Sequence, residues 1–297
     1  MRILFVADQH EYSLYALDEL THVAENTFSD VTMLGILPRQ LIPKRGCKGG
    51  LFDLGFEHPL IDALERYRQR FMEHWKPEEC PYRDNDFRYE WFCVEEGHYE
   101  QIKVCRGRLK DLRVKIRFGQ PVAEVLSAVD EEGVSLVVLG CTYGPECLWQ
   151  DDPAFPRKLV NTLPCSVLLV KEKEPINEIH ACLDESTITQ ESLELVNQMA
   201  VIHNAKLNII ALTKGGGVKR DVYAWFDEIY GYYRNRGLDV SSSFTEIDDF
   251  EKFITERVQN GLLALWMGKK SLLDRLFQRD SIEHFIGTSR TSVLVLR

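Results

Sequence analysis

The sequence lacks any run of apolar residues that approaches the roughly 18 needed for a membrane-spanning helix. Its first apolar stretch reaches Asp8 before the apolar core of a signal peptide could be completed. Basic residues are also scarce, with 36 Lys and Arg against 46 Asp and Glu and a formal net charge of −10. Because a nucleic-acid-binding surface needs an excess of Lys and Arg, these absences predict a cytoplasmic protein with no membrane and no nucleic-acid partner.

Two further absences concern chemistry. The eight cysteines lack the short, dense spacing of a secreted disulfide framework, so we expect thiols, mostly in the cores of a protein from a reducing compartment. No Gly-x-Ser-x-Gly elbow, His-Glu-x2-His helix or Walker lysine is present. The sequence therefore predicts a protein that is not an enzyme and has no catalytic residues.

The main feature that is present is an internal repeat within 297 residues, a length sufficient for two ordinary cores. A shift of 176 residues places Ile3 on Ile179 and Asp8 on Asp184. Near the end of each copy, a shift of 126 places residues 166–171 on 292–297, so the first copy carries about fifty extra residues, which fall within 38–111. We expect domains at 1–172 and 176–297, joined by a charged linker.

Each copy alternates short apolar runs with stretches of helical period, which is typical of an α/β fold with a parallel sheet. Near-continuous apolar runs indicate strands buried on both faces; they span 3–7, 31–37, 134–140 and 165–170 in the first copy, and 179–183, 207–213, 262–268 and 292–296 in the second. Helical spacing is seen in Leu17, Leu20 and Ala24. In the second copy, Thr187 with Gln190 resembles a capping box that opens the corresponding helix.

Three features together resemble the universal stress protein family in both copies, the insertion excepted. They are an Asp ending the first strand (Asp8 and Asp184), a Gly that ends a later strand before a loop of about a dozen residues, and a last strand of sequence Ser-Val-Leu. The resemblance implies two tandem five-stranded parallel-sheet, Rossmann-like domains in a pseudo-twofold arrangement. Segments 165–170 and 292–296 would then meet as antiparallel edges, which protects an apolar edge strand from aggregation. Whether this intramolecular pseudo-dimer dimerises further stays open.

For nucleotide-binding members, the resemblance implies an Asp near adenine and ribose, and a loop Gly-x2-Gly-x9-Gly-Ser/Thr around the phosphates. Glycines let backbone N–H groups approach phosphate oxygens, and a following helix N-terminus favours the anion. Transferred to this sequence, the cofactor-binding candidates are Asp184, Gly268, Ser271 and Ser281 in the second copy, and Asp8, Gly140 and Gly144 in the first.

The loop of the first copy departs from that pattern. One residue too many separates Gly140 from Gly144, and Phe155 and Pro156 occupy the region where Gly-Ser is expected. Pro156 has no N–H to offer and Phe155 adds bulk, so this loop disfavours phosphate. Asp8 itself has two open interpretations, a ligand contact or a carboxylate that accepts N–H groups where the strand turns into a helix.

The loop of the second copy keeps the spacing but changes the residue types. Ser271 follows Gly268 at the expected distance, and nine residues separate it from Ser281, which stands with Ile282 where Gly-Ser is expected. Lys269 and Lys270 add positive charge. No cofactor is certain, but ATP or AMP fits the second copy better than the first, and a solvated loop is the competing interpretation.

The insertion at 38–111 is rich in cysteine, histidine and aromatic residues. Cys80, Cys93, His98 and Cys105 would supply four zinc-type ligands, yet no Cys-x2-Cys pair is present, so we expect no metal site. A helical excursion is the favoured interpretation, because Leu60 and Leu64 begin a run at helical spacing that continues to Phe71. An insertion of this kind could present a surface to a protein partner. A shorter counterpart in the second copy crowds six aromatic residues into 223–233, either as core or as an interface.

Two functions follow as hypotheses. The first is a non-enzymatic stress-response or regulatory protein that pairs its tandem domains through their last strands and acts through protein contacts or a small ligand. The alternative is an adenine-nucleotide sensor that uses the second domain.

Overall fold

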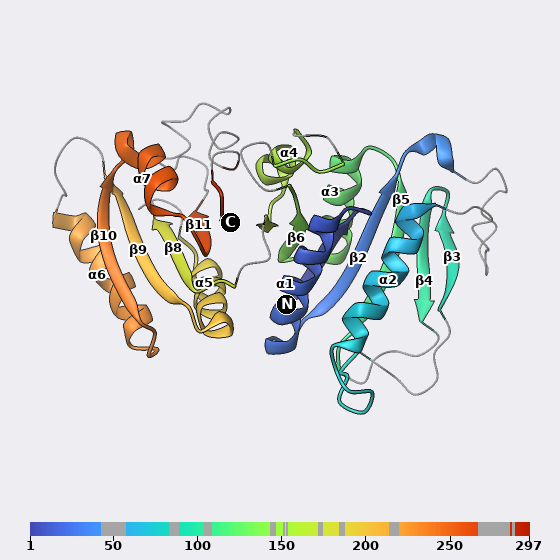
Figure 1. Cartoon of the computed structure of the whole chain (residues 1–297), viewed down its shortest axis with the longest axis horizontal. Coiled ribbons are helices and arrows are strands. Elements are labelled where there is room, and N and C mark those ends of the chain that lie inside the picture. Colours follow the sequence, from blue (N-terminus) through green and yellow to red (C-terminus); the bar gives the residue numbers. More distant parts are fainter. Residues whose placement is uncertain are drawn as a thin grey trace. The chain divides into compact units, whose positions relative to one another are not determined.

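A computed structural model gives the fold of the chain. It describes residues 1–42, 58–82, 89–103, 109–142, 147–150, 152, 154–171, 175–183, 188–213, 220–266, 286 and 289–297. By their contacts the residues form two compact units, 1–140 with 149–165 and 141–148 with 166–297. Each unit is a mostly parallel sheet whose strands alternate with helices, which confirms the predicted fold class (Figure 1).

The first unit is built on the strand order β6-β1-β2-β5-β4-β3. Its strands are β1 (Arg2–Ala7), β2 (Asp30–Leu37), β3 (Tyr89–Glu95), β4 (His98–Lys103), β5 (Leu112–Phe118) and β6 (Leu136–Gly140). Its helices are α1 (Glu11–Asn26), α2 (Pro59–Glu73), α3 (Pro121–Glu132) and α4 (Ala154–Thr162), with a 3-10 turn η1 (Arg39–Leu41). Strands β6, β1, β2 and β5 are parallel, with Ile3 in register with both Leu136 and Val31. Helix α1 packs against α2, and α3 against α4.

The insertion is only partly the helical excursion that the sequence predicts. Helix α2 is present, and its apolar stripe, including Leu60, Leu64 and Phe71, is buried. A second described part of it, 89–103, forms a hairpin of β3 with β4, which adds two antiparallel strands to the edge of β5. The sequence contains a signal for this hairpin in Gly97, which follows Glu96. In the structure Gly97 lies at the turn and adopts a left-handed φ of 85°, which glycine accepts without steric cost.

The second unit is built on the order β10-β9-β8-β11-β12-β7. Its strands are β7 (Ser166–Val170), β8 (Glu178–Leu183), β9 (Lys206–Thr213), β10 (Val240–Glu246), β11 (Leu262–Trp266) and β12 (Ser292–Leu296). Its helices are α5 (Gln190–His203), α6 (Arg220–Arg234) and α7 (Phe250–Arg257), with a 3-10 turn η2 (Ile247–Asp249). The first five strands of that order are all parallel to one another.

Strand β7 runs antiparallel to β12, with Leu168 opposite Leu294. This is the contact between the two last strands that the resemblance implies. Two serines join the strands reciprocally: the backbone N–H of Lys171 donates to Ser292 Oγ at 3.2 Å, and that of Arg297 donates to Ser166 Oγ at 3.3 Å. Because of this pairing, β7 groups with the second unit, whereas the sequence assigns it to a domain at 1–172. The domain limits stay a prediction.

The start of α5 differs from the sequence prediction. The capping residue is Thr189, not Thr187: Thr189 Oγ1 accepts the N–H of Ser192, and Ser192 Oγ accepts the N–H of Thr189, each at 3.1 Å. A serine, Ser192, stands in the third helical position, where a capping box usually has Glu or Gln. The sequence pattern therefore matched Thr187 with Gln190, two residues too early. Across the part of the chain that the structure describes, no helix is both long and apolar enough to cross a membrane.

Candidate functional site at the carboxyl end of the first sheet

Asp8 directly follows β1, at the edge where open parallel sheets bind ligands, and its side chain is fully buried. Its Oδ1 accepts the backbone N–H of His10 at 2.9 Å and the hydroxyl of Ser13 at 2.7 Å. Its Oδ2 contacts His10 Nδ1 at 3.0 Å and accepts a hydrogen bond from the hydroxyl of Tyr12. Both oxygens are therefore engaged by residues of the same strand–helix connection.

These contacts follow from local chain geometry. His10 has an extended backbone and directly precedes α1, so its N–H lies in the turn between β1 and the helix. The carboxylate of Asp8, two residues earlier, accepts this N–H as in an Asx turn. The structural role seen for Asp8 is thus that of a turn acceptor between the strand and the helix, and a ligand role stays a prediction.

Tyr12 is the centre of this site. Its hydroxyl donates to Asp8 and also accepts the backbone N–H of Gln150 at 2.8 Å. Its ring stacks on that of His10, with the ring centroids 5.3 Å apart. Gly140, another predicted site residue, is needed here for packing: a Cβ at this position would lie 2.2 Å from the carbonyl oxygen of Tyr12. The first turn of α1 therefore packs directly on the end of β6. A nucleotide site at this end of the strand would need open space.

The insertion contributes to the same site, which the sequence analysis missed. Tyr67 of α2 donates its hydroxyl to the backbone oxygen of Asp8 at 2.8 Å. Burial, and then the negative charge of Asp8, raise the pKa of Tyr67 to about 12, so the phenol stays protonated and remains a donor. The only sequence signal was the membership of Tyr67 in the apolar stripe of α2.

Aromatic rings lie in and beside the stretch of the first loop where the family pattern expects Gly-Ser. Trp149 and Phe155 are both almost fully buried and stack with ring centroids 4.1 Å apart. Asp152 accepts the N–H of Ala154 at 2.8 Å, at the start of α4. Pro156 is buried in the same helix. A buried aromatic stack therefore occupies this stretch, and the unsuitability of the loop for phosphate stays a prediction.

The loop that follows β6 contains a disulfide between Cys141 and Cys147. Within it, the N–H of Thr142 donates to the oxygen of Leu148 at 3.0 Å, and the N–H of Leu148 donates to Thr142 Oγ1 at 2.7 Å. The expectation that the cysteines are thiols is therefore wrong for this pair, because the loop returns on itself and brings together two cysteines six residues apart. Cys182 does fit the expectation as a buried thiol, and burial raises its pKa.

The other predicted site residues cannot be placed in this way. Asp184, Gly268, Ser271 and Ser281 in the second copy, and Gly144 in the first, lie outside the described residues.

The zinc alternative also reaches outside the described residues, at Cys105. Of its other members, Cys93 is in a disulfide, and His98 contacts Glu95 at 2.6 Å through Nδ1 and Glu124 at 3.3 Å through Nε2. Among the side chains that the structure describes, no three His, Cys, Asp or Glu residues gather in a metal-binding group.

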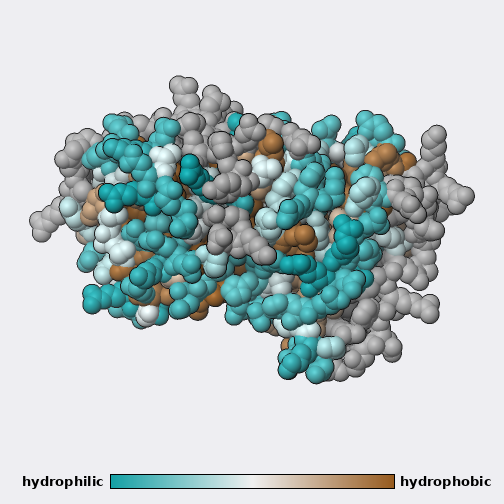
Figure 2. Space-filling model, in the orientation of Figure 1, coloured by the Kyte–Doolittle hydropathy of each residue, from teal (hydrophilic) through white to brown (hydrophobic). Residues whose placement is uncertain are grey.

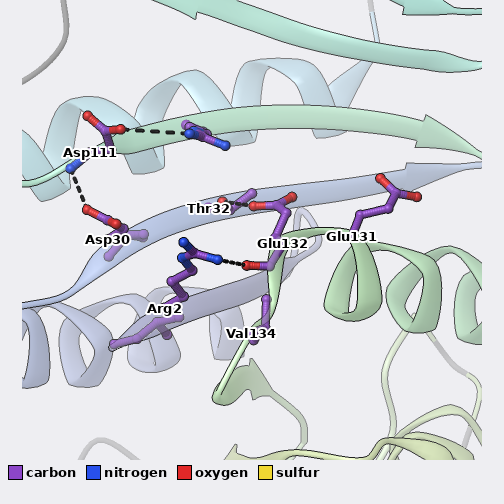
Figure 3. Close-up of a pocket in the computed structure, with 10 residues that line it drawn as sticks. Arg2, Asp30, Thr32, Asp111, Glu131, Glu132 and Val134 are labelled. Carbon is purple, nitrogen blue, oxygen red and sulfur yellow. Dashed lines mark hydrogen bonds and ion pairs between the residues drawn. The ribbon is translucent and has the colours of Figure 1, made fainter.

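A cavity of about 280 Å³ lies at the opposite, amino end of the first sheet (Figure 3). Its lining is mainly charged and comes from β1, β2, β5 and the end of α3: Arg2, Ile3, Asp30, Val31, Thr32, Asp111, Arg113, Glu131, Glu132 and Val134.

The four carboxylates of this cavity all have partners in the protein. Glu131 pairs with Arg117, and Glu132 with Lys115 at 3.2 Å and with Thr32. Asp111 lies 3.7 Å from Arg113, and Asp30 accepts the N–H of Asp111 at 2.9 Å. The ion pairs of Glu131 with Arg117 and of Glu132 with Lys115 join α3 to β5, so these carboxylates have a structural role at the cavity.

Comparisons place these observations among known proteins. No protein-family model and no curated protein matches the sequence. Solved structures do match over the whole chain. One is a universal stress protein from Archaeoglobus fulgidus DSM 4304, with 12% identity and a TM-score of 0.58, covering 100% of this chain and 98% of that one. Another is the functionally unknown protein PA1789 from Pseudomonas aeruginosa PAO1, with 16% identity and a TM-score of 0.54, covering 99% and 92%.

A third match warns against reading function from fold. It is the cytoplasmic domain of a prokaryotic cation chloride cotransporter, with 12% identity and a TM-score of 0.51, covering 99% of this chain and 93% of that one. At such identities the likeness establishes the fold alone. The chain has the fold of universal stress proteins, as the sequence resemblance implies.

Proposed function

We propose that this protein is a non-enzymatic regulatory protein of the stress-response type, which acts through protein contacts or a small ligand from a cytoplasmic location. The observation that carries the proposal is the state of Asp8. Its carboxylate is saturated by His10, Tyr12 and Ser13, so it has no capacity left for an adenosine group. The pairing of domains 1–172 and 176–297 through β7 and β12 would give the chain a self-contained scaffold, and the insertion would offer a surface to a protein partner.

The test is to measure ATP turnover and ATP binding with the purified full chain. The proposal expects no ATP turnover above the background of a heat-inactivated sample. It also expects substitutions in the first loop to leave the level of ATP binding unchanged. Tight ATP binding accompanied by turnover would overturn it.

A second candidate is an adenine-nucleotide sensor that uses Asp184, Gly268, Ser271 and Ser281. Its support comes from the spacing of the second loop, which matches the family pattern, and from the two lysines beside Gly268. ATP or AMP would be the ligand, with the phosphates held by backbone N–H groups and positive charge.

Matched substitutions distinguish the two candidates. Gly268→Val should abolish nucleotide binding if the second domain holds the phosphates, because a β-branched side chain blocks close approach to the backbone. Gly144→Val, the same change in the first loop, should leave it intact. Absence of any co-purifying nucleotide mass and of any ATP-dependent rise in melting temperature would remove the sensor hypothesis.

A further inference from the structure

Strand β10 forms one edge of the second unit, since among the described residues it pairs only with β9. It has seven residues, and none is Lys, Arg or Pro. Proteins usually protect edges of this length with such residues or cover them, because an open edge presents a row of backbone hydrogen-bonding groups to other strands. All seven side chains keep some exposure to solvent.

The internal repeat provides a comparison for this edge. Strand β5 occupies the same place in the first unit: it also has seven residues, and Leu112 is in register with Val31 as Val240 is with Leu207. There, an antiparallel strand, β4, covers the outer edge from His98 to Gln101. This position of the fold therefore accepts an added antiparallel strand, and the second copy lacks the insertion that supplies it.

The same comparison explains two exposed aromatic residues. Phe244 corresponds in register to Ile116, which lies opposite Tyr99 of β4 and is fully buried. Phe244 is 37% exposed and Tyr223 of α6 is 52% exposed, and their rings contact each other with centroids 4.9 Å apart. Figure 2 shows hydrophobic atoms among the polar ones over α6 and β10.

The charges near β10 differ between its two ends. Glu246 and Asp248 lie at the carboxyl end, close in sequence to the aromatic contact. Arg234 and Arg236 precede the amino end, both exposed, with Asp239 offsetting one of them. An antiparallel arrangement of two identical β10 strands sets the acidic end of each against the basic end of the other.

We propose that β10 is a dimerisation edge that pairs antiparallel with β10 of a second copy of this chain, about a twofold axis near Ser243. Backbone hydrogen bonds across the axis would extend the sheet, and each Phe244–Tyr223 pair would be covered by the other copy. The interface is isologous, so it closes after two copies.

The experiment is sedimentation equilibrium of the full chain with variants at and away from the edge. Ser243→Lys places two ammonium groups opposite each other at the axis, where like charges destabilise strand pairing, and should raise the dimer dissociation constant about tenfold or more. Val201→Lys is the matched control, because Val201 is 59% exposed on α5 and far along the chain from β10. A monomer at every soluble concentration, or a dimer equally stable in both variants, would overturn the proposal.

A second pair of variants, which exchanges charges between the two ends of β10, tests the interface even if Ser243→Lys fails to fold. Arg234→Glu and Asp248→Arg should each weaken the dimer alone, because each places like charges across the interface. An equimolar mixture of the two variants should restore association as a heterodimer. If both variants dimerise like the unmodified chain and their mixture behaves no differently, the ends of β10 do not meet and the proposal fails.

Discussion

At the scale of single residues, the hydroxyl of Tyr12 joins the carboxylate of Asp8 to the backbone of Gln150. Tyr12→Phe removes that hydroxyl and leaves the buried Asp8 and the half-buried backbone N–H of Gln150 each with one hydrogen bond fewer, which should cost about 1–3 kcal/mol of unfolding free energy. Urea unfolding measures the loss. Tyr15→Phe is the control, because the Tyr15 hydroxyl is exposed and donates to Glu11 on the surface of α1, so no measurable loss is expected. Equal losses in the two variants would contradict the central role of Tyr12.

His180 gives a prediction about pH. It is buried in β8, and burial lowers its pKa below the ordinary value of about 6.5, against a smaller opposing effect of Glu178. The folded state therefore holds the neutral ring, while the unfolded chain takes up a proton near pH 6.5. The stability from this group is fully present above pH 6.5 and is lost as the pH falls toward the lowered pKa.

The corresponding residue of the first copy is Leu4, so His180→Leu is the natural variant. Unfolding free energies measured at pH 7.5 and 5.5 should differ less in His180→Leu than in the unmodified chain. An identical pH dependence in the two proteins would contradict the assignment of a buried neutral histidine.

At the scale of elements, the capping box of α5 determines where that helix begins. Thr189→Ala removes the acceptor for the N–H of Ser192 and should cost about 1 kcal/mol. Thr187→Ala tests the position that sequence pattern favours. The result expected from urea unfolding is a clear loss for Thr189→Ala and little for Thr187→Ala; the reverse order would move the cap back to Thr187.

Elements also show which parts of the fold a sequence predicts well. Long apolar runs such as β1 and β8 are buried on both faces of a parallel sheet, so hydrophobicity alone identifies them. The β3–β4 hairpin was missed because its residues, from Tyr89 to Lys103, mix charged and aromatic types and form no continuous apolar run. Their strand character depends on the neighbouring β5, which lies outside the window that a local pattern examines.

At the scale of the whole molecule, the antiparallel contact of β7 with β12 joins segments that are more than one hundred residues apart. Ser166→Ala and Ser292→Ala each remove the acceptor of one backbone N–H and should each cost about 1 kcal/mol. The reciprocal geometry predicts losses of similar size, and urea unfolding of the two variants tests it. A loss confined to one serine would show that the two ends of this strand pair are not equivalent.

The sequence by itself determined the repeat and the alternation of strands and helices, because these depend on apolar patterns that can be read locally along the chain. The antiparallel meeting of the last strands was implied by the family resemblance, and the β7–β12 pair shows it. It also identified Asp8 and Gly140 as special positions. Only the tertiary structure decided that Asp8 is saturated by Tyr12, Ser13 and His10, that Tyr67 from the insertion reaches the same site, and that Cys141 and Cys147 are joined. Hydrogen bonds, ring stacks and disulfides depend on where side chains meet in space, and residue spacing along the chain does not contain that information.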